Sequence, residues 1–361
     1  MSNFFVCKNR VEIEGVDVGQ FEGFTMSADW RTFGETATLL LPMYAIGASG
    51  TTSGKASARL RDPIKNALVK VGAEVSVYCR YNDMEKVRVF HGFIENVEQG
   101  FPTKLYLRDD TFRLKFGNVK DGWDGSADIP KIASDCIKVS NESFKKYRSE
   151  NGFTRPVGDL KYSVAGENVE AILSPINFDN YAIGRSPFDV FQHLMSLLCC
   201  YGGAKNNSVF LGALVKDNKR PIVKLSTATN VIARDIANIN GMFVNYDVQV
   251  SSVLADGKKF TAEAGEKTSG SEPYRAFCNL KTESGVKDFA NRLRESLTGT
   301  RNKGSITTLL YPKLQLLDHV KYTDTIFEIE DKLYLVVQYQ FTANGKGYFQ
   351  KIEVTDTVFA L

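Results

Sequence analysis

Apolar and polar side chains alternate along much of this chain, with the two-residue period of a β-strand that buries one face. The alternation is clear over residues 10–18, 73–81, 86–98 and 104–110. Short turn-like segments join the last three, so the pattern predicts an antiparallel meander. We therefore expect the first third of the chain to be a block of strands.

The last third of the chain repeats this order of elements. A helix is predicted over residues 284–299, where Ser284 is a suitable N-cap and Gly299 a suitable end. Strand-like segments lie on both sides of it. These segments are residues 240–254, 258–265, 305–312, 318–325, 332–345 and 348–356. We therefore expect a second block of strands, with a helix before its last meander.

Two eleven-residue segments show the likeness between the blocks directly. Residues 104–114 read KLYLRDDTFRL and residues 351–361 read KIEVTDTVFAL. We expect each to be the closing strand of its block, and alternation fixes which of its side chains face the core. A gapless alignment pairs Lys104 with Lys351, Leu105 with Ile352, Leu107 with Val354, Asp109 with Asp356, Phe112 with Phe359 and Leu114 with Leu361.

A polar segment and a helix separate the early strands of the first block from its meander. Residues 45–57 are rich in Gly, Ser, Thr and Ala, which predicts a long mobile loop. Residues 62–72 begin with Asp-Pro, a helix start. Lys55, Arg59 and Arg61 are candidate partner contacts, since mobile segments with cationic ends become ordered against partners. An ordinary solvated loop is the alternative.

The middle of the chain has a different pattern. A helix is expected at residues 129–140, and a strong one at residues 186–203, which Ser186 caps and Gly202 ends. Strand-like segments follow at residues 208–215 and 221–226. The chain is therefore predicted to be mainly β with α+β, in three domains. These are a first strand block at 1–115, a mixed α+β middle domain at 116–235 and a second strand block at 236–361.

Composition narrows the classes of function. Hydrophobic residues make up 43% and charged residues 24% of the 361 positions, as in soluble globular proteins. No apolar run reaches the ~18 residues of a membrane span, and the N-terminus lacks a signal-peptide pattern. The 45 basic and 42 acidic residues nearly balance, which disfavours a nucleic-acid-binding surface over the whole chain. Six scattered cysteines predict reduced thiols and folding in cytoplasm.

Residues with catalytic or metal-binding potential do not form a known motif. The histidines, His91, His193 and His319, are far apart in sequence. The adjacent Cys199 and Cys200 fit small core residues better than a metal pair. We predict no cofactor, no metal site and no catalysis. A glycosidase would need a carboxylate pair, for which the candidates are Asp109 with Asp110 and Glu328 with Glu330. The first two are expected on opposite faces of a strand.

Several motifs resemble the baseplate hub proteins of contractile phage tails, namely the late-control D group and the similar N-terminal hub part of type VI secretion spike proteins. The likeness lies in VGAEVSVYCRY, VRVFHGFIENVE and KLYLRDDTFRL in the first block. It continues with SPFDVFQHLMSLLCCYGG in the middle domain and DFANRLRESLTG in the last block. Asp318 and Val320 stand near the family's acidic-Val step. His319 separates them, and Leu316 and Leu317 replace the usual Pro-Gly.

The resemblance implies a mechanical role. Each hub chain carries two tail-tube-like antiparallel β-barrels, which here would be residues 1–115 and 236–361, each closed by one of the eleven-residue segments. Three such chains form a ring of six that adapts a hexameric tail tube to a trimeric spike. The implied partners are two further copies of the chain, the tail tube or tube-initiator protein, the central spike and other baseplate proteins, with possible passage of DNA through the lumen. The implied location is the virion tail baseplate, assembled in the host cytoplasm. A tail-associated cell-wall hydrolase and a carbohydrate-binding tail-tip protein are the alternatives.

Overall fold

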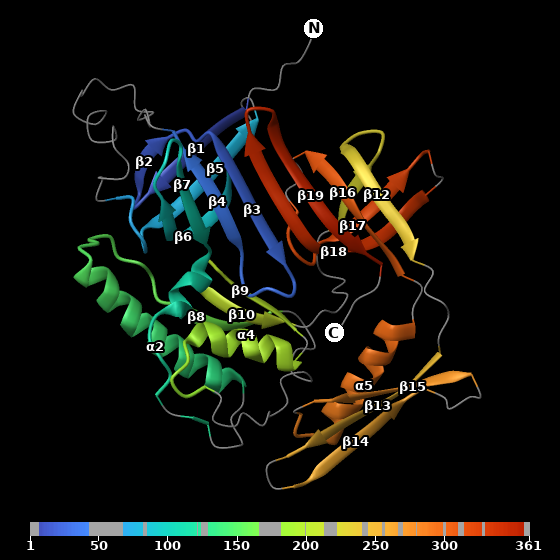
Figure 1. Cartoon of the computed structure of the whole chain (residues 1–361). Helices are drawn as coiled ribbons and strands as arrows, with labels where there is room; N and C mark the ends of the chain where they lie inside the picture. The colour runs from blue at the N-terminus through green and yellow to red at the C-terminus, as the bar shows by residue number, and fades with distance from the viewer. Residues whose placement is uncertain are drawn as a thin grey trace, which may run out of the picture.

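The structure is a computed structural model of the whole chain (Figure 1). It describes residues 7–42, 68–81, 85–120, 122–123, 129–165, 182–198, 200–212, 222–239, 245–254, 257–265, 270–278, 280–298, 301–309, 314–326 and 329–356. These residues show a mainly β protein with α+β parts, as the sequence predicts. The predicted mobile loop at 45–57 and the helix at 62–72, up to residue 67, lie outside the described residues.

Thirteen of the described strands form one large sheet. The first block supplies β1 (Cys7–Ile13), β2 (Val16–Gly19), β3 (Gly23–Asp29), β4 (Thr36–Leu41), β5 (Glu74–Tyr81), β6 (Val87–Glu98) and β7 (Thr103–Arg108). The second block supplies β11 (Ile222–Ser226), β12 (Val231–Ile239), β16 (Arg301–Leu309), β17 (His319–Asp324), β18 (Ile329–Asn344) and β19 (Gly347–Thr355). Figure 1 shows the blue and red halves of this sheet side by side.

The two blocks have the same strand order. In the first, neighbouring strands follow the order β3-β4-β7-β6-β5-β1, and in the second the order β12-β16-β19-β18-β17-β11. The pairs are antiparallel in both blocks except at the last position, where β1–β5 is antiparallel and β11–β17 is parallel. The duplication expected from the sequence is therefore present in the topology.

The hydrogen-bond register makes this equivalence specific to residues. Leu105 pairs with Leu39 and Val97, and Ile352 occupies the same place between Ile306 and Tyr339. The register of β6 against β7 shifts between residues 94 and 96, and that of β18 against β19 shifts between residues 336 and 338. The alignment of residues 104–108 with 351–355 is therefore correct, down to a β-bulge in the neighbouring strand.

The same turn precedes the equivalent strands β5 and β17. The amide of Gly72 donates to the carbonyl of Ile94 at 2.8 Å, and the amide of Leu317 donates to the carbonyl of Val336 at 2.8 Å. Both residues have left-handed backbone, with φ of 84° at Gly72 and 65° at Leu317. Leu317 thus adopts a conformation in which glycine is less strained, at the position where the hub family has Gly.

The expectation of two separate barrels is wrong for the described strands. β3 pairs antiparallel with the second half of β18, so β7 and β19 belong to one sheet, and the described strands do not close into a barrel. At this junction the edge strand of each block forms backbone hydrogen bonds with the other block, so neither block has to close on itself. The sequence does not show this pairing, because β3 and β18 are about 300 residues apart in the chain. In addition, β11 and β12 begin before residue 236 and pair with second-block strands.

The first eleven-residue segment is a strand only as far as Arg108. Asp110–Lys115 is instead a 3₁₀-helix, η1, capped by Asp109, whose side chain accepts from the amide of Thr111. The expected strand therefore ends where Asp109 offers this local hydrogen bond, which competes with strand pairing. Phe112 is buried in η1, whereas its counterpart Phe359 lies outside the described residues.

The middle domain contains the predicted helices. α2 (Ile129–Glu150) is longer than expected, and α4 (Pro187–Leu198) begins after Ser186, whose hydroxyl accepts from the amide of Asp189 at 3.2 Å. α4 does not reach Gly202, because residues from Tyr201 onward form a strand. A small sheet has the order β8 (Lys161–Ala165), β10 (Ser208–Gly212) and β9 (Tyr201–Lys205).

A separate subdomain is inserted between β12 and β16. The sheet has the order β14 (Lys259–Ala264), β13 (Asn245–Val253) and β15 (Ser271–Phe277), and α5 (Glu283–Thr298) packs on it. The predicted helix at 284–299 is therefore present. The strands predicted at 240–254 and 258–265, however, belong to this subdomain and not to the large sheet.

The apolar core runs through the junction of the blocks. Phe24 of β3 and Phe341 of β18 lie with ring centroids 6.0 Å apart, and both are buried.

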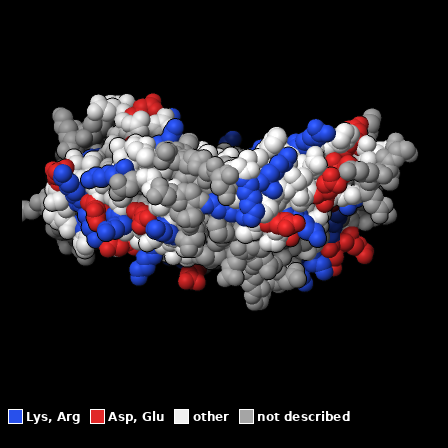
Figure 2. All heavy atoms as spheres, turned by 90° about the horizontal axis from the view of Figure 1, so that it is seen from below, with Lys and Arg blue, Asp and Glu red and all other residues white. Residues whose placement is uncertain are grey.

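No helix among the described residues is long and apolar enough to cross a membrane. On the face seen from below, Lys and Arg side chains lie among Asp and Glu side chains (Figure 2).

Candidate functional site

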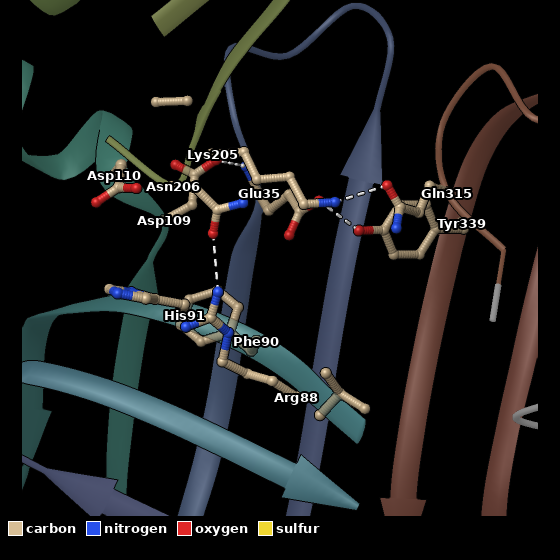
Figure 3. Close-up of a pocket in the computed structure, with 12 residues that line it drawn as sticks. Glu35, Arg88, Phe90, His91, Asp109, Asp110, Lys205, Asn206, Gln315 and Tyr339 are labelled. Atoms are coloured by element: carbon tan, nitrogen blue, oxygen red, sulfur yellow. Dashed lines mark hydrogen bonds between the residues drawn. The ribbon is translucent and has the colours of Figure 1, made fainter. Parts of the chain in front are cut away.

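A small polar cavity lies where the first block, the second block and the middle domain meet (Figure 3). Its volume is about 50 Å³. Its polar lining residues are Glu35, Arg88, His91, Asp109, Asp110, Lys205, Asn206, Gln315 and Tyr339. A small-molecule site usually has a volume of ~300 Å³ or more. This cavity therefore has room for only a few waters. We call the residues that line it the joint, because they come from all three parts of the chain.

One hydrogen bond joins the two blocks directly across this joint. The hydroxyl of Tyr339, on β18, donates to Oε1 of Glu35 at 2.6 Å (Figure 3). Glu35 is the residue before β4. Tyr339 is buried. Burial and the adjacent Glu35 carboxylate hold the pKa of Tyr339 well above its ordinary value, so the phenol keeps its proton. The second block is therefore fixed to the first by a charge-assisted hydrogen bond.

Asp109 fixes Glu35 from the other side. Its Oδ2 accepts from the amide of Glu35 at 2.9 Å, and its Oδ1 accepts from the amide of Thr111 at 3.0 Å. Burial and the charge of Glu35 raise the pKa of Asp109 to about 8, although its hydrogen bonds act in the opposite direction. The carboxyl is therefore mostly protonated at pH 7, and the joint avoids two adjacent negative charges.

The tight turn between β9 and β10 inserts the middle domain into the joint. Asn206 and Asn207 have left-handed φ of 51° and 62°, as a two-residue hairpin turn requires. Asn206 Oδ1 accepts from Arg88 Nη2 at 2.8 Å, and Lys205 Nζ donates to Gln315 Oε1 at 2.7 Å (Figure 3). One turn thus contacts β6 of the first block and the loop before β17 of the second block.

The same turn is tied to η1. The amide of Asn207 donates to Asp110 Oδ2 at 3.0 Å, and Arg113 Nη1 donates to Asn207 Oδ1 at 2.7 Å. Arg113 is buried and also donates to the carbonyl of Gly158 at 2.7 Å. These bonds leave little freedom for one domain to rotate relative to the others.

The structure brings some of the residues singled out from the sequence together, since His91, Asp109 and Asp110 line the joint. Lys55, Arg59 and Arg61 lie outside the described residues. His91 lines the joint, where burial lowers its pKa and its Nε2 lies 3.2 Å from Glu74 Oε1. His193 is on α4 and His319 begins β17. Among the described residues, no group of three or more His, Cys, Asp or Glu side chains could hold a metal ion.

The expected placement of Asp109 and Asp110 on opposite faces of a strand is wrong. Both are buried, because the strand ends before them and η1 turns them into the joint. Their role as anchors was missed by sequence reasoning. The signal was present: Asp followed two residues later by Thr is a local capping pattern that competes with a continued strand. Of the second carboxylate pair, Glu328 lies outside the described residues and Glu330 is on β18.

Comparison with known proteins shows which fold this is. No family model matches the chain, and no curated protein matches it. Among solved structures, the 43 kDa tail protein of prophage MuSo2 from Shewanella oneidensis is 13% identical, with a TM-score of 0.58 over 96% of this chain and 98% of that one. The tail protein from Neisseria meningitidis MC58 is 12% identical, with a TM-score of 0.58 over 97% and 96%.

A chain of the Francisella PdpA–VgrG complex is 10% identical, with a TM-score of 0.51 over 100% of this chain and 60% of that chain. At such identities the likeness concerns the fold alone. The fold of the phage tail proteins, predicted from the sequence motifs, is thereby confirmed for this chain.

Proposed function

We propose that this chain is the structural hub of a phage tail baseplate or of a related contractile injection machine. Three copies form a ring that adapts a sixfold tail tube to a threefold central spike. The observation that carries the proposal is the identical strand order of the two blocks. Three chains with two equivalent blocks each supply six similar units, which is what a sixfold neighbour requires.

The inserted subdomain supports the threefold side of this role. β3 and β4 are joined by a short connection, whereas the equivalent β12 and β16 are separated by β13, β14, β15 and α5. The insertion therefore occurs once per chain and would occur three times in the ring. A trimeric spike can bind features that repeat with its own symmetry, while the shared strands remain nearly sixfold.

The face of the large sheet opposite its apolar core fits a lumen through which a polymer passes. At the centre of the sheet, side chains that alternate with core residues carry hydroxyl or amide groups. These are Thr25, Ser27, Thr36, Thr38, Gln340 and Thr342. Charged side chains of both signs lie beside them on the same face, namely Asp29, Lys104, Arg108, Lys351 and Glu353. Because these charges nearly balance, the face neither holds nor repels a polyanion strongly, which suits the transit of DNA. We place the chain in the virion tail, in contact with tube, spike and other baseplate proteins, and assign it no enzymatic role.

The rigid joint serves the same purpose. The angle between the two blocks of one chain sets the step around the ring, and it must be equal in every copy for the ring to close. Tyr339, Glu35 and the β9–β10 turn hold that angle by hydrogen bonds among three domains.

The mass and shape of the purified protein test the proposal. Light scattering should give the mass of three chains, and negative-stain images should show a ring with six lobes. A stable monomer, dimer or tetramer, or a trimer without a ring, would contradict it.

A further inference from the structure

We propose that the open edge of β12 in one copy pairs with the end of β6 in the next copy, and so repeats between chains the junction that β3 and β18 form within a chain. This inference rests on the proposed hub function. It names the surface that closes the ring and the register of its strands.

The junction within the chain provides the template. Along one edge β18 pairs with β19, and along its other edge it pairs with two different strands in turn. Its first half pairs with β17, from Leu335 back to Ile329, and its second half pairs antiparallel with β3. In the second half, Gln338 is opposite Asp29 and Gln340 is opposite Ser27.

In the first block, the strand equivalent to β18 is β6. It pairs with β7 along one edge, and its first part pairs with β5, from Val87 to Phe93. The matching β-bulges place Asn96, Val97 and Glu98 at the positions of Gln338, Tyr339 and Gln340. In the described part of the chain, no strand pairs with the second edge of β6 at these three residues.

The strand equivalent to β3 is β12. β12 pairs antiparallel with β16 as β3 pairs antiparallel with β4, and no described strand occupies its other edge. Leu39 of β4 pairs with Leu105 and Ile306 of β16 pairs with Ile352, so Leu39 and Ile306 are equivalent. Two residues earlier on each strand, Ala37 pairs with Met26 and Gly304 pairs with Ile236. Ile236 therefore has the position of Met26, and Ala237 has that of Ser27. Among the described strands, β12 therefore has a free edge equivalent to the paired edge of β3, and β6 has a free edge equivalent to the paired edge of β18.

Because these two edges are complementary, the geometry of the internal junction fixes the external one. We expect Glu98 opposite Ala237 of the next copy, Val97 opposite Asn238 and Asn96 opposite Ile239. A further observation fits this contact: Phe101, in the hairpin that follows β6, is 75% exposed. The contact is head-to-tail, so it makes a ring only if the rotation from chain to chain closes.

Engineered cysteine pairs test the register. Side chains opposite each other on antiparallel strands have Cβ atoms ~4.5–5.5 Å apart, close enough for a disulfide after a small adjustment. The double variant Glu98→Cys/Ala237→Cys should, on mild oxidation, give a band of three chains on a non-reducing gel that a reductant converts to single chains. Of the six native cysteines, Cys79, Cys136, Cys200 and Cys278 are buried.

Two matched variants control the experiment. Ser27→Cys/Gln340→Cys tests the same geometry within one chain and should form a disulfide whether or not copies associate. Glu98→Cys/Ala233→Cys moves one cysteine four residues along β12, roughly 13 Å, and should not form the three-chain band.

The inference is overturned if the Ser27/Gln340 pair forms but the Glu98/Ala237 pair gives no three-chain band, or if the Ala233 variant gives that band equally well. An open ladder of larger products would also overturn it, because the contact would then not close. The solution mass of the same samples separates the two proposals. A trimer without the band removes this interface alone, and the absence of any trimer also removes the proposed function.

Discussion

Replacement of Arg148 by methionine tests how the middle domain is held on the first block. The guanidinium, on α2, donates to both carboxylate oxygens of Glu14 at 3.0 and 2.8 Å, and the two side chains are only 6% and 8% exposed. Removal of one partner of a buried ion pair costs about 3–5 kcal/mol. The amide of Glu74 still donates to Glu14 at 2.6 Å, so we expect a cost near the lower end.

Native-state hydrogen exchange of α2 measures this cost locally. A loss of about 3 kcal/mol corresponds to roughly 100-fold faster exchange, since each 1.4 kcal/mol is a factor of ten. Lys145→Met on the same helix is the matched control. It breaks an ion pair with Asp159 whose side chains are 59% and 50% exposed, and exposed pairs are worth about 1 kcal/mol or less. Exchange in Arg148→Met within threefold of wild type, or no faster than in Lys145→Met, would refute the reasoning.

Three further predictions concern the joint and the absence of catalysis. Tyr339→Phe removes the hydroxyl that donates to Glu35 and should destabilise the protein by about 1–3 kcal/mol, seen as a lower melting temperature; an unchanged one would count against the joint. Asp109 has a folded pKa of about 8 and an ordinary value of 3.8, so the unfolded chain loses this proton first and stability should fall as pH rises between these values. Asp109→Asn should flatten that profile, and an equal slope in both proteins would show another group responsible. Purified protein should leave peptidoglycan and DNA intact in cleavage assays; cleavage abolished by a single carboxylate-to-amide change would reveal an enzyme.

Local patterns gave correct predictions where one segment decides its own structure. α4 begins at Pro187 because Ser186 and Asp189 cap it within a single turn. The match of Leu105 with Ile352 was correct because alternation fixes which side of a strand is buried, and the pairing partners keep that side. Local reasoning failed at Asp110, where it predicted a strand and the structure has a 3₁₀-helix buried against the β9–β10 turn.

The sequence by itself determined that the chain is mainly β, that its first and last parts end in equivalent meanders, and which side chains of those strands face a core. These properties depend on periodicity and capping within a few neighbouring residues. Only the tertiary structure decided that the two parts share one sheet and that Tyr339, Glu35 and Asn206 meet at one joint. The reason is physical: β3 and β18 are joined by backbone hydrogen bonds, which every residue except proline can donate, so no side-chain pattern in either strand announces the partner.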